Sequence, residues 1–193
     1  LDHLGPFARS VLDLALVYDA LQGFDPGDAA CARRPAEPTA PGLDQGIADA
    51  RVAVLIDADN APAAKIEVIL AEVARYGAAN VRRAYGNWKS PHLKSWEATL
   101  HEYAIRPIQQ FAYSTGKNAS DMAMVIDALE LLYTDRPDAF GIVSSDADFT
   151  PLVMHLRAKG AAVYGFGAAK TPEPFVNACS RFLFLEKLGA EEL

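Results

Sequence analysis

The segment VAVLIDADN (residues 52–60) sets five apolar residues before two aspartates and an asparagine. A short run rich in branched apolar residues is typical of a strand that is buried on both faces of a parallel sheet. The segment IVSSDAD (residues 142–148) likewise joins an apolar run to two acids. Because the carboxyl ends of parallel strands face the ligand crevice of an open sheet, we expect the two acidic segments to share one pocket.

Short apolar runs alternate with helical patterns from residue 51 onward, which predicts βαβ units around a parallel sheet. The expected strands cover residues 52–56, 80–85, 105–111, 140–143 and 162–166. The expected helices between them cover residues 62–76, 90–103, 120–132 and 150–160. The predicted fold class is therefore α/β, with a Rossmann-like, mainly parallel sheet of about five strands flanked by helices.

The first 48 residues have a different pattern. Apolar residues at helical spacing predict a helix over residues 11–21, and a linker rich in proline and glycine follows it. We expect a short helical extension at 1–48, one domain at 50–188 and a tail at 189–193. A chain of 193 residues is long enough for one α/β domain with such an extension and too short for two full-sized enzymes.

The composition indicates a soluble protein. About half of the residues (51%) are hydrophobic, but no run is long and apolar enough to span a bilayer and no signal-peptide pattern is present. Cys31 and Cys179 fit no metal-ligand spacing, so we expect two free thiols and a cytoplasmic location. The net charge of −7 disfavours nucleic-acid binding, yet residues 81–120 hold six basic residues against two acidic ones. An ordinary solvated surface and a phosphate-binding track both explain this locally basic region.

Aspartates at the predicted strand and helix ends form the candidate site. Asp57 and Asp59 follow the first strand, Asp146 and Asp148 follow the fourth, and Asp121 lies at the start of the helix after the third. Each alone is an ordinary turn former or helix cap. Together they would repel one another unless protons or a cation neutralised them. Oxygen ligands of this kind suit Mg²⁺ or Mn²⁺, which assist phosphodiester hydrolysis.

In these segments the chain resembles the NYN family, the LabA-like branch of the PIN-domain nucleases. The resemblance extends from about residue 50 to residue 188, and four segments carry it: LIDADN (55–60), KNASDMAMVIDAL (117–129), SSDADFTPLV (144–153) and FVNACSRFLFLEKL (175–188). Several motifs in the right order across a whole domain are more specific than a single pair of aspartates. The resemblance implies a Rossmann-like PIN fold and metal-dependent cleavage of RNA.

The resemblance also implies roles for individual acids. The principal ligands of Mg²⁺ or Mn²⁺ would be Asp57, Asp121 and Asp146, with Asp148 as the fourth acid. Hydrogen bonds from Asn60 and Ser145 would support these ligands. Two further acids, Asp59 and Asp127, are candidates for a supporting or a surface position.

Other residues are candidates for contacts with RNA. Lys117, Arg82 and Lys89 could bind phosphates, although solvated basic side chains are the simpler explanation for each. Trp88 and Tyr113 could stack on unpaired bases, although aromatic residues in loops are more often packed against the protein.

Residues 1–48 resemble a different family, the amidase signature hydrolases, through the segment DHLGPFARSVLDLALVYDALQGFDPGD (2–28). The resemblance implies that enzymes of that family use a serine nucleophile, a second serine and a lysine. All three residues would lie upstream of such a fragment. Ser10 is the sole serine before Ser90, and no lysine precedes Lys65. The fragment therefore lacks the amidase catalytic residues, and a gene fusion or a joining of unrelated fragments would explain its position.

Two other functions remain open from the sequence. One is an RNA-binding or scaffold domain with little catalysis. The other is a haloacid-dehalogenase-like phosphatase with Asp57 and Asp59 as nucleophile and acid/base, although that family expects threonine or valine where Ala61 stands. The expected partner is RNA, single-stranded or structured, and no membrane is expected. The oligomeric state stays open, with a homodimer as one possibility.

Overall fold

The computed structural model describes residues 7–27, 36, 38–43, 50–109 and 119–189 of the chain. Contacts divide the chain into two units, residues 1–46 and 47–193. The first unit contains α1 (Val11–Leu21) and the short 3₁₀ turn η1 (Ala40–Gly42). Among the described residues, no helix is long and apolar enough to cross a membrane.

Hydrogen bonds at both ends of α1 define the described part of the first unit. The Ser10 hydroxyl caps α1 by accepting a hydrogen bond from the Asp13 amide at 3.1 Å, which fits the preference for serine at this position. The Asp19 carboxylate accepts hydrogen bonds from the amide and hydroxyl of Thr39 and from the amide of Ala40. These bonds, with the Thr39 hydroxyl first, lower the pKa of Asp19. They tie α1 to the segment that precedes η1.

The second unit is built on a six-stranded sheet in which every pairing is parallel. Its strands are β1 (Arg51–Asp57), β2 (Ala78–Gly86), β3 (Arg106–Gln109), β4 (Ala139–Val143), β5 (Ala162–Gly167) and β6 (Arg181–Phe184). The predicted α/β class and parallel sheet are confirmed, and the five expected strands are present. The sixth strand, β6, adds one strand to the predicted count.

Five helices and three 3₁₀ turns lie in the described part of the second unit. The helices of the second unit are α2 (Ile66–Ala74), α3 (Trp96–Glu102), α4 (Ala119–Thr134), α5 (Thr150–Ala158) and α6 (Glu173–Ala178). The 3₁₀ turns are η2 (Ala63–Lys65), η3 (Pro91–Leu93) and η4 (Ala147–Phe149). Two helices that were predicted as continuous, at 62–76 and 90–103, therefore begin as 3₁₀ turns that precede α2 and α3.

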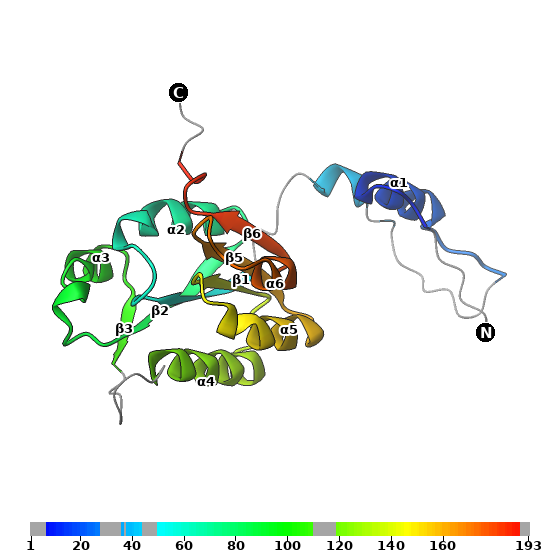
Figure 1. Cartoon of the computed structure of the whole chain (residues 1–193). Helices are drawn as coiled ribbons and strands as arrows, with labels where there is room; N and C mark the ends of the chain where they lie inside the picture. The colour runs from blue at the N-terminus through cyan, green and yellow to red at the C-terminus, as the bar shows by residue number, and fades with distance from the viewer. Residues whose placement is uncertain (1–6, 28–35, 37, 44–49, 110–118, 190–193) are drawn as a thin grey trace. The chain divides into compact units, whose positions relative to one another are not determined.

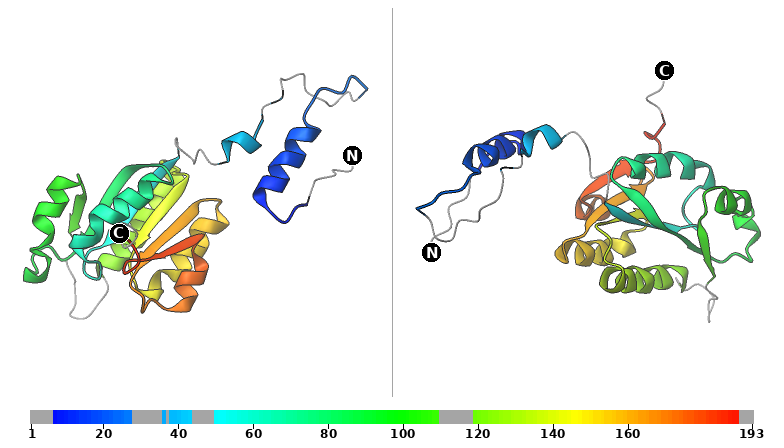
Figure 2. Two further views of the ribbon diagram at one scale, coloured as in Figure 1. Left: turned by 90° about the horizontal axis from the view of Figure 1, so that it is seen from above. Right: turned by 180° about the vertical axis from the view of Figure 1, so that it is seen from behind.

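Helices cover both faces of the sheet, as Figure 1 shows, with α2 and α3 on one face and α4, α5 and α6 on the other. Successive residues of β1 point to opposite faces, because side chains alternate along a strand. Val54 and Ile56 pack in the core beneath α2 and α3, whereas Ala53 and Leu55 pack in the core beneath α4 and α5. This burial on both faces explains why the β1 sequence is a continuous apolar run. Figure 2 shows the same layers from two further directions.

The strand order, β3-β2-β1-β4-β5-β6, reverses direction between β1 and β4. The chain adds β2 and β3 on one side of β1, and then adds β4, β5 and β6 on the other side. Ligands of open α/β sheets bind beside the carboxyl ends of the two strands at such a reversal. The fold therefore places the acidic segments after β1 and β4 at the position where a ligand site is expected.

Candidate functional site

Asp57 is the last residue of β1, and only 1% of its surface is exposed. Its Oδ2 atom accepts hydrogen bonds from the Asn60 side-chain amide at 2.9 Å and from the Ser144 hydroxyl at 2.8 Å. Its Oδ1 atom is buried without a hydrogen-bond partner among the described residues. Burial is the main reason that the pKa of Asp57 is raised. One carboxylate oxygen is thus fixed in place, while the other has no donor in the part of the chain that the structure describes.

Ser144 joins the ends of β1 and β4. Its buried hydroxyl donates to Asp57 and accepts a hydrogen bond from the backbone amide of Asp146 at 3.1 Å. The sequence motif predicts a supporting role for the neighbouring residue, Ser145. The Ser145 hydroxyl instead accepts a hydrogen bond from the Ala168 amide at 2.8 Å, just after β5. Because Ile56 pairs with Val143 in the sheet, the next residue on each strand brings Asp57 beside Ser144.

Asp146 and Asp148 lie in the turn that follows β4. The Asp146 side chain caps η4, since its Oδ1 atom accepts a hydrogen bond from the Asp148 amide at 2.9 Å. Asp146 is half-buried and Asp148 is exposed. One oxygen of Asp146 is therefore engaged in the turn, and the Asp148 carboxylate faces solvent.

Asp121 lies in the first turn of α4 and brings a third element to the same edge of the sheet. Its pKa is raised to about 6, first by burial and then by the negative charges of Asp57, Asp146, Asp59 and Asp148. These four carboxylates therefore lie close enough to Asp121 for their charges to raise its pKa. A hydrogen bond of 3.1 Å from the Ser120 hydroxyl to Asp59 also joins α4 to the turn after β1.

The family model described as the NYN domain matches residues 51–186, which includes all six strands. The chain belongs to the NYN domain family. Members of this family are generally ribonuclease-like hydrolases with a PIN-like nuclease fold. The resemblance that the sequence motifs indicated is therefore confirmed.

A solved structure supports the fold of the NYN domain. It is a protein of unknown function from Vibrio parahaemolyticus, which matches with a TM-score of 0.57 and 19% sequence identity. The alignment covers 72% of this chain and 95% of the Vibrio chain. At this level of identity the likeness shows a shared fold and carries no information about activity.

Similarity to curated hydrolases covers a smaller share of the chain. Subunit AtzE of 1-carboxybiuret hydrolase from Pseudomonas sp. (strain ADP) is 49% identical over 84 residues, which are 42% of this chain and 18% of that subunit. The 6-aminohexanoate-cyclic-dimer hydrolase of Paenarthrobacter ureafaciens is 43% identical over 53 residues, or 28% of this chain and 11% of that enzyme. This chain thus spans less than a fifth of either relative. The partial match agrees with the amidase-like fragment seen in the sequence.

Asp127 lies outside the acidic edge of the NYN domain. Its Oδ2 atom accepts hydrogen bonds from the Arg83 guanidinium at 2.8 Å and from the Tyr85 hydroxyl at 2.7 Å. Burial, followed by the hydrogen bond to Asp127, raises the pKa of Tyr85. Asp127 therefore fastens α4 to β2, the strand that pairs with β1, and so sets the position of the helix that carries Asp121.

The predicted phosphate-binding residues differ in their surroundings. The Arg82 guanidinium donates to the backbone carbonyls of Ala79 and Tyr103, at 3.2 Å and 2.9 Å, and so connects β2 with the end of α3. Lys89 is exposed in the loop that follows β2. Lys117 and the aromatic candidate Tyr113 lie outside the described residues. Among the described residues, no three His, Cys, Asp or Glu side chains are arranged to hold a metal ion as they stand.

Proposed function

We propose that the NYN domain is a metal-dependent ribonuclease that hydrolyses RNA phosphodiester bonds with Mg²⁺ or Mn²⁺. The observation that carries the proposal is the convergence of Asp57, Asp121 and Asp146 at one sheet edge, where Asp57 Oδ1 is buried and has no donor among residues 50–109 and 119–189. Burying an acceptor without a partner is costly, and crowding carboxylates is also costly. A divalent cation would offset both costs at once.

The chemistry of the donor set fits such a cation. Asp57, Asp121 and Asp146, with Asp148 as a fourth acid, offer the oxygen ligands that Mg²⁺ and Mn²⁺ prefer. When bound, a divalent cation would offset negative charge on the phosphate and make water a stronger nucleophile. Because these side chains do not form a ready-made metal site as they stand, the carboxylates must draw closer together when a cation binds.

The surrounding residues have distinct tasks in this proposal. Asn60 and Ser144 hold Asp57 Oδ2, so that Oδ1 is directed away from these donors and is free to bind. Ser144 also holds the Asp146 amide, which keeps the two acidic turns in register. Asp121 holds a proton below about pH 6 and must lose it to act as an anionic ligand.

RNA is the proposed substrate because NYN domains typically bind RNA. The carboxylates themselves argue for a divalent cation and a phosphate ester. A phosphodiester within an RNA chain fits an open sheet edge better than it fits an enclosed pocket.

The test is a cleavage assay on single-stranded and structured RNA, with Mg²⁺, Mn²⁺ or EDTA. We expect cleavage with either metal, none in EDTA, and none with Asp146→Asn. The matched control is Asp135→Asn, which removes an exposed carboxylate just beyond the end of α4 and should leave cleavage unchanged. Intact RNA that remains bound to the wild-type protein would instead support a binding domain, and phosphate release from small phosphomonoesters would support a phosphatase.

A further inference from the structure

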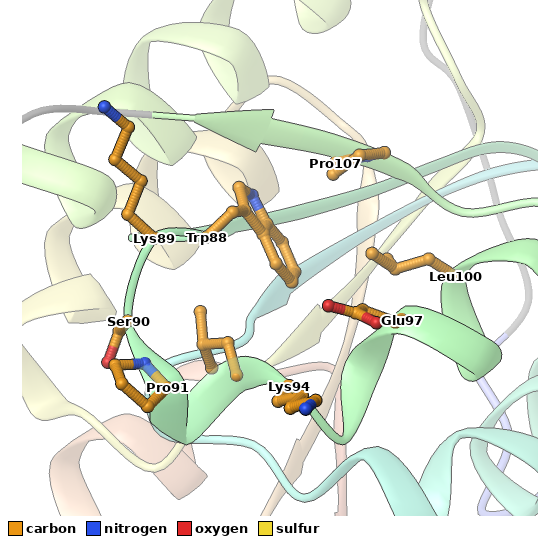
Figure 3. A pocket seen from close by; sticks show the side chains of 9 residues that line it. Trp88, Lys89, Ser90, Pro91, Lys94, Glu97, Leu100 and Pro107 are labelled. Atoms are coloured by element: carbon orange, nitrogen blue, oxygen red, sulfur yellow. The ribbon is translucent and has the colours of Figure 1, made fainter.

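A hollow of about 360 Å³ opens between the loop that follows β2, the helix α3 and Pro107 of β3, and the proposed function gives it no role. Its walls combine an aromatic ring and apolar side chains with charged groups at the rim. Figure 3 shows the Trp88 indole between Pro107 of β3 and the α3 side chains Glu97 and Leu100. Lys89 and Lys94 extend from different sides of the hollow. A flat apolar surface with cations nearby suits a ligand that has both an aromatic ring and a phosphate.

The Trp88 ring is held in a fixed orientation. Its Nε1–H group donates to the Ile108 carbonyl at 2.9 Å, and its backbone amide donates to Gln109 Oε1 at 2.9 Å. The ring also meets the buried ring of Trp96 edge-on, with ring centroids 6.3 Å apart. Trp88 itself is only half-buried. A half-buried ring that is already immobilised loses little entropy when a base stacks on its accessible face.

The hollow lies next to the acidic edge. Gly86 is the last residue of β2, and a Cβ atom added to it would lie 2.8 Å from Leu93 Cδ1 and 3.4 Å from Asp59 Oδ1. Leu93 lines the hollow, and Asp59 belongs to the carboxylates that raise the pKa of Asp121. The hollow and the acidic edge are therefore separated by little more than the backbone of Gly86.

The charges at the rim suit a nucleotide. Lys94 is exposed and, among the described residues, belongs to no ion pair, so its amino group can contact a phosphate. Glu97 is also exposed and would repel a phosphate, but its carboxylate can accept a hydrogen bond from the amino group of a base. These two opposite charges on the same side of the hollow favour one orientation of the ligand.

We propose that this hollow binds one nucleotide of single-stranded RNA, with its base stacked on Trp88 and its phosphate on Lys94. The inference rests on the proposed ribonuclease function, since it identifies where a neighbouring nucleotide of the same substrate is held. It also predicts that bases with an exocyclic amino group, which can donate to Glu97, bind better than uracil.

The experiment measures binding of short single-stranded RNA to the full chain in EDTA, which prevents cleavage. The chain has two tryptophans, and Trp96 is buried, so stacking should quench the fluorescence of Trp88. We expect Trp88→Leu to weaken binding by about tenfold. Trp88→Phe keeps an aromatic face, so it should retain binding but lose the quenching.

The charge of Lys94 is tested by the dependence of binding on salt. Lys94→Gln should make the slope of log K against log salt less steep by about 0.7, the value for one phosphate contact with a single strand. Lys159→Gln is the matched control, because Lys159 is an exposed lysine that follows α5 and precedes the amino end of β5. We expect this control to keep the wild-type slope. Glu97→Gln should reduce the preference for bases with an amino group.

The outcomes separate this inference from the proposed function. The inference is overturned if RNA binds without quenching tryptophan fluorescence, or if Lys94→Gln has the same salt slope as the wild type. Either result overturns it even if the protein cleaves RNA when Mn²⁺ is added. If RNA quenches the tryptophan fluorescence of the wild type and Trp88→Phe abolishes this quenching, the nucleotide site is supported. If the same protein cleaves no RNA with Mn²⁺ or Mg²⁺, the ribonuclease proposal is overturned. A wild-type protein that binds no RNA overturns both.

Discussion

The Ser144 hydroxyl donates a hydrogen bond of 2.8 Å to the Asp57 carboxylate and so couples the ends of β1 and β4. Both residues are buried, with 2% and 1% of their surfaces exposed. The bond fixes Asp57 Oδ2, whereas no described residue donates a hydrogen bond to Oδ1. This hydrogen bond therefore links the two acidic turns before a ligand binds.

Ser144→Ala should weaken both metal binding and RNA cleavage. Loss of a hydrogen bond that orients a metal ligand typically lowers affinity or activity by about ten- to a hundredfold. The measurement is Mn²⁺ affinity by calorimetry, together with the rate of RNA cleavage. Ser95→Ala is the control, since Ser95 is exposed and its side chain caps no helix. Equal Mn²⁺ affinity in Ser144→Ala and wild type would contradict the orienting role.

Asp121 should make the stability of the metal-free protein depend on pH. Its pKa in the folded protein is about 6, above the ordinary value of 3.8, so the folded state binds the proton more tightly than the unfolded state does. The free energy of unfolding should therefore fall as pH rises from about 4 to about 6. Asp121→Asn removes this pH-dependent loss of stability. The variant should therefore be more stable than the wild type above about pH 6, but not below about pH 4.

The size of this effect is limited because Asp121 is only half-buried and solvent screens its repulsion. We expect Asp121→Asn to gain about 1 kcal/mol in EDTA at neutral pH. Urea unfolding at several pH values measures it, with Asp135→Asn as the control. In addition, Mn²⁺ should stabilise the wild type more than it stabilises Asp121→Asn, because binding to the folded state alone raises stability. A variant that is less stable than wild type at neutral pH would contradict the repulsion.

The contact of Asp127 with Arg83 and Tyr85 should contribute to stability. Asp127→Ala leaves a guanidinium and a hydroxyl without their acceptor, so it should cost about 1–3 kcal/mol. Tyr85→Phe removes one of the two bonds and should cost less. Urea unfolding of both variants and of the double variant gives the coupling energy between the two residues. Additive effects in that cycle would show that Tyr85 and Asp127 do not interact in solution.

Gly167 should be required for the geometry around Ser144. A Cβ atom added to Gly167 would lie 2.7 Å from the Ser144 backbone oxygen, so Gly167→Ala must displace the backbone beside Asp57. We expect a loss of about 1–3 kcal/mol from overpacking, together with weaker Mn²⁺ binding. Gly141→Ala is the control, because its added Cβ would lie 3.6 Å or more from its neighbours, an ordinary contact distance. If both variants bind Mn²⁺ as the wild type does, the crowding at Gly167 has no bearing on the site.

The sequence predicted those parts of the fold that depend on local patterns. The apolar run from Val52 to Ile56 predicted β1 because a strand buried on both faces needs apolar residues at every position. The strand β6 (Arg181–Phe184) and the helix α6 (Glu173–Ala178) were not predicted, because these short neighbouring elements share one apolar stretch without a clear periodic pattern.

In the candidate site, too, some features could be predicted from the sequence and others could not. The positions of Asp57, Asp121 and Asp146 at strand and helix ends followed from the sequence. The contact of Ser144 with Asp57 could not be predicted from the sequence, because it depends on the register that pairs Ile56 with Val143. Register between distant strands leaves no local sequence pattern. The bonds of Asp127 with β2 were likewise not predicted, since they join residues more than forty positions apart.

The most direct test of the acidic site is to compare the RNA cleavage rate with Mn²⁺ binding in the same titration, for the wild type and for Asp57→Asn. The proposal predicts that cleavage and Mn²⁺ binding saturate together in the wild type, and that Asp57→Asn loses both while remaining folded. RNA cleavage that persists in EDTA, or that is unchanged in Asp57→Asn, would contradict a metal-dependent ribonuclease built on these carboxylates.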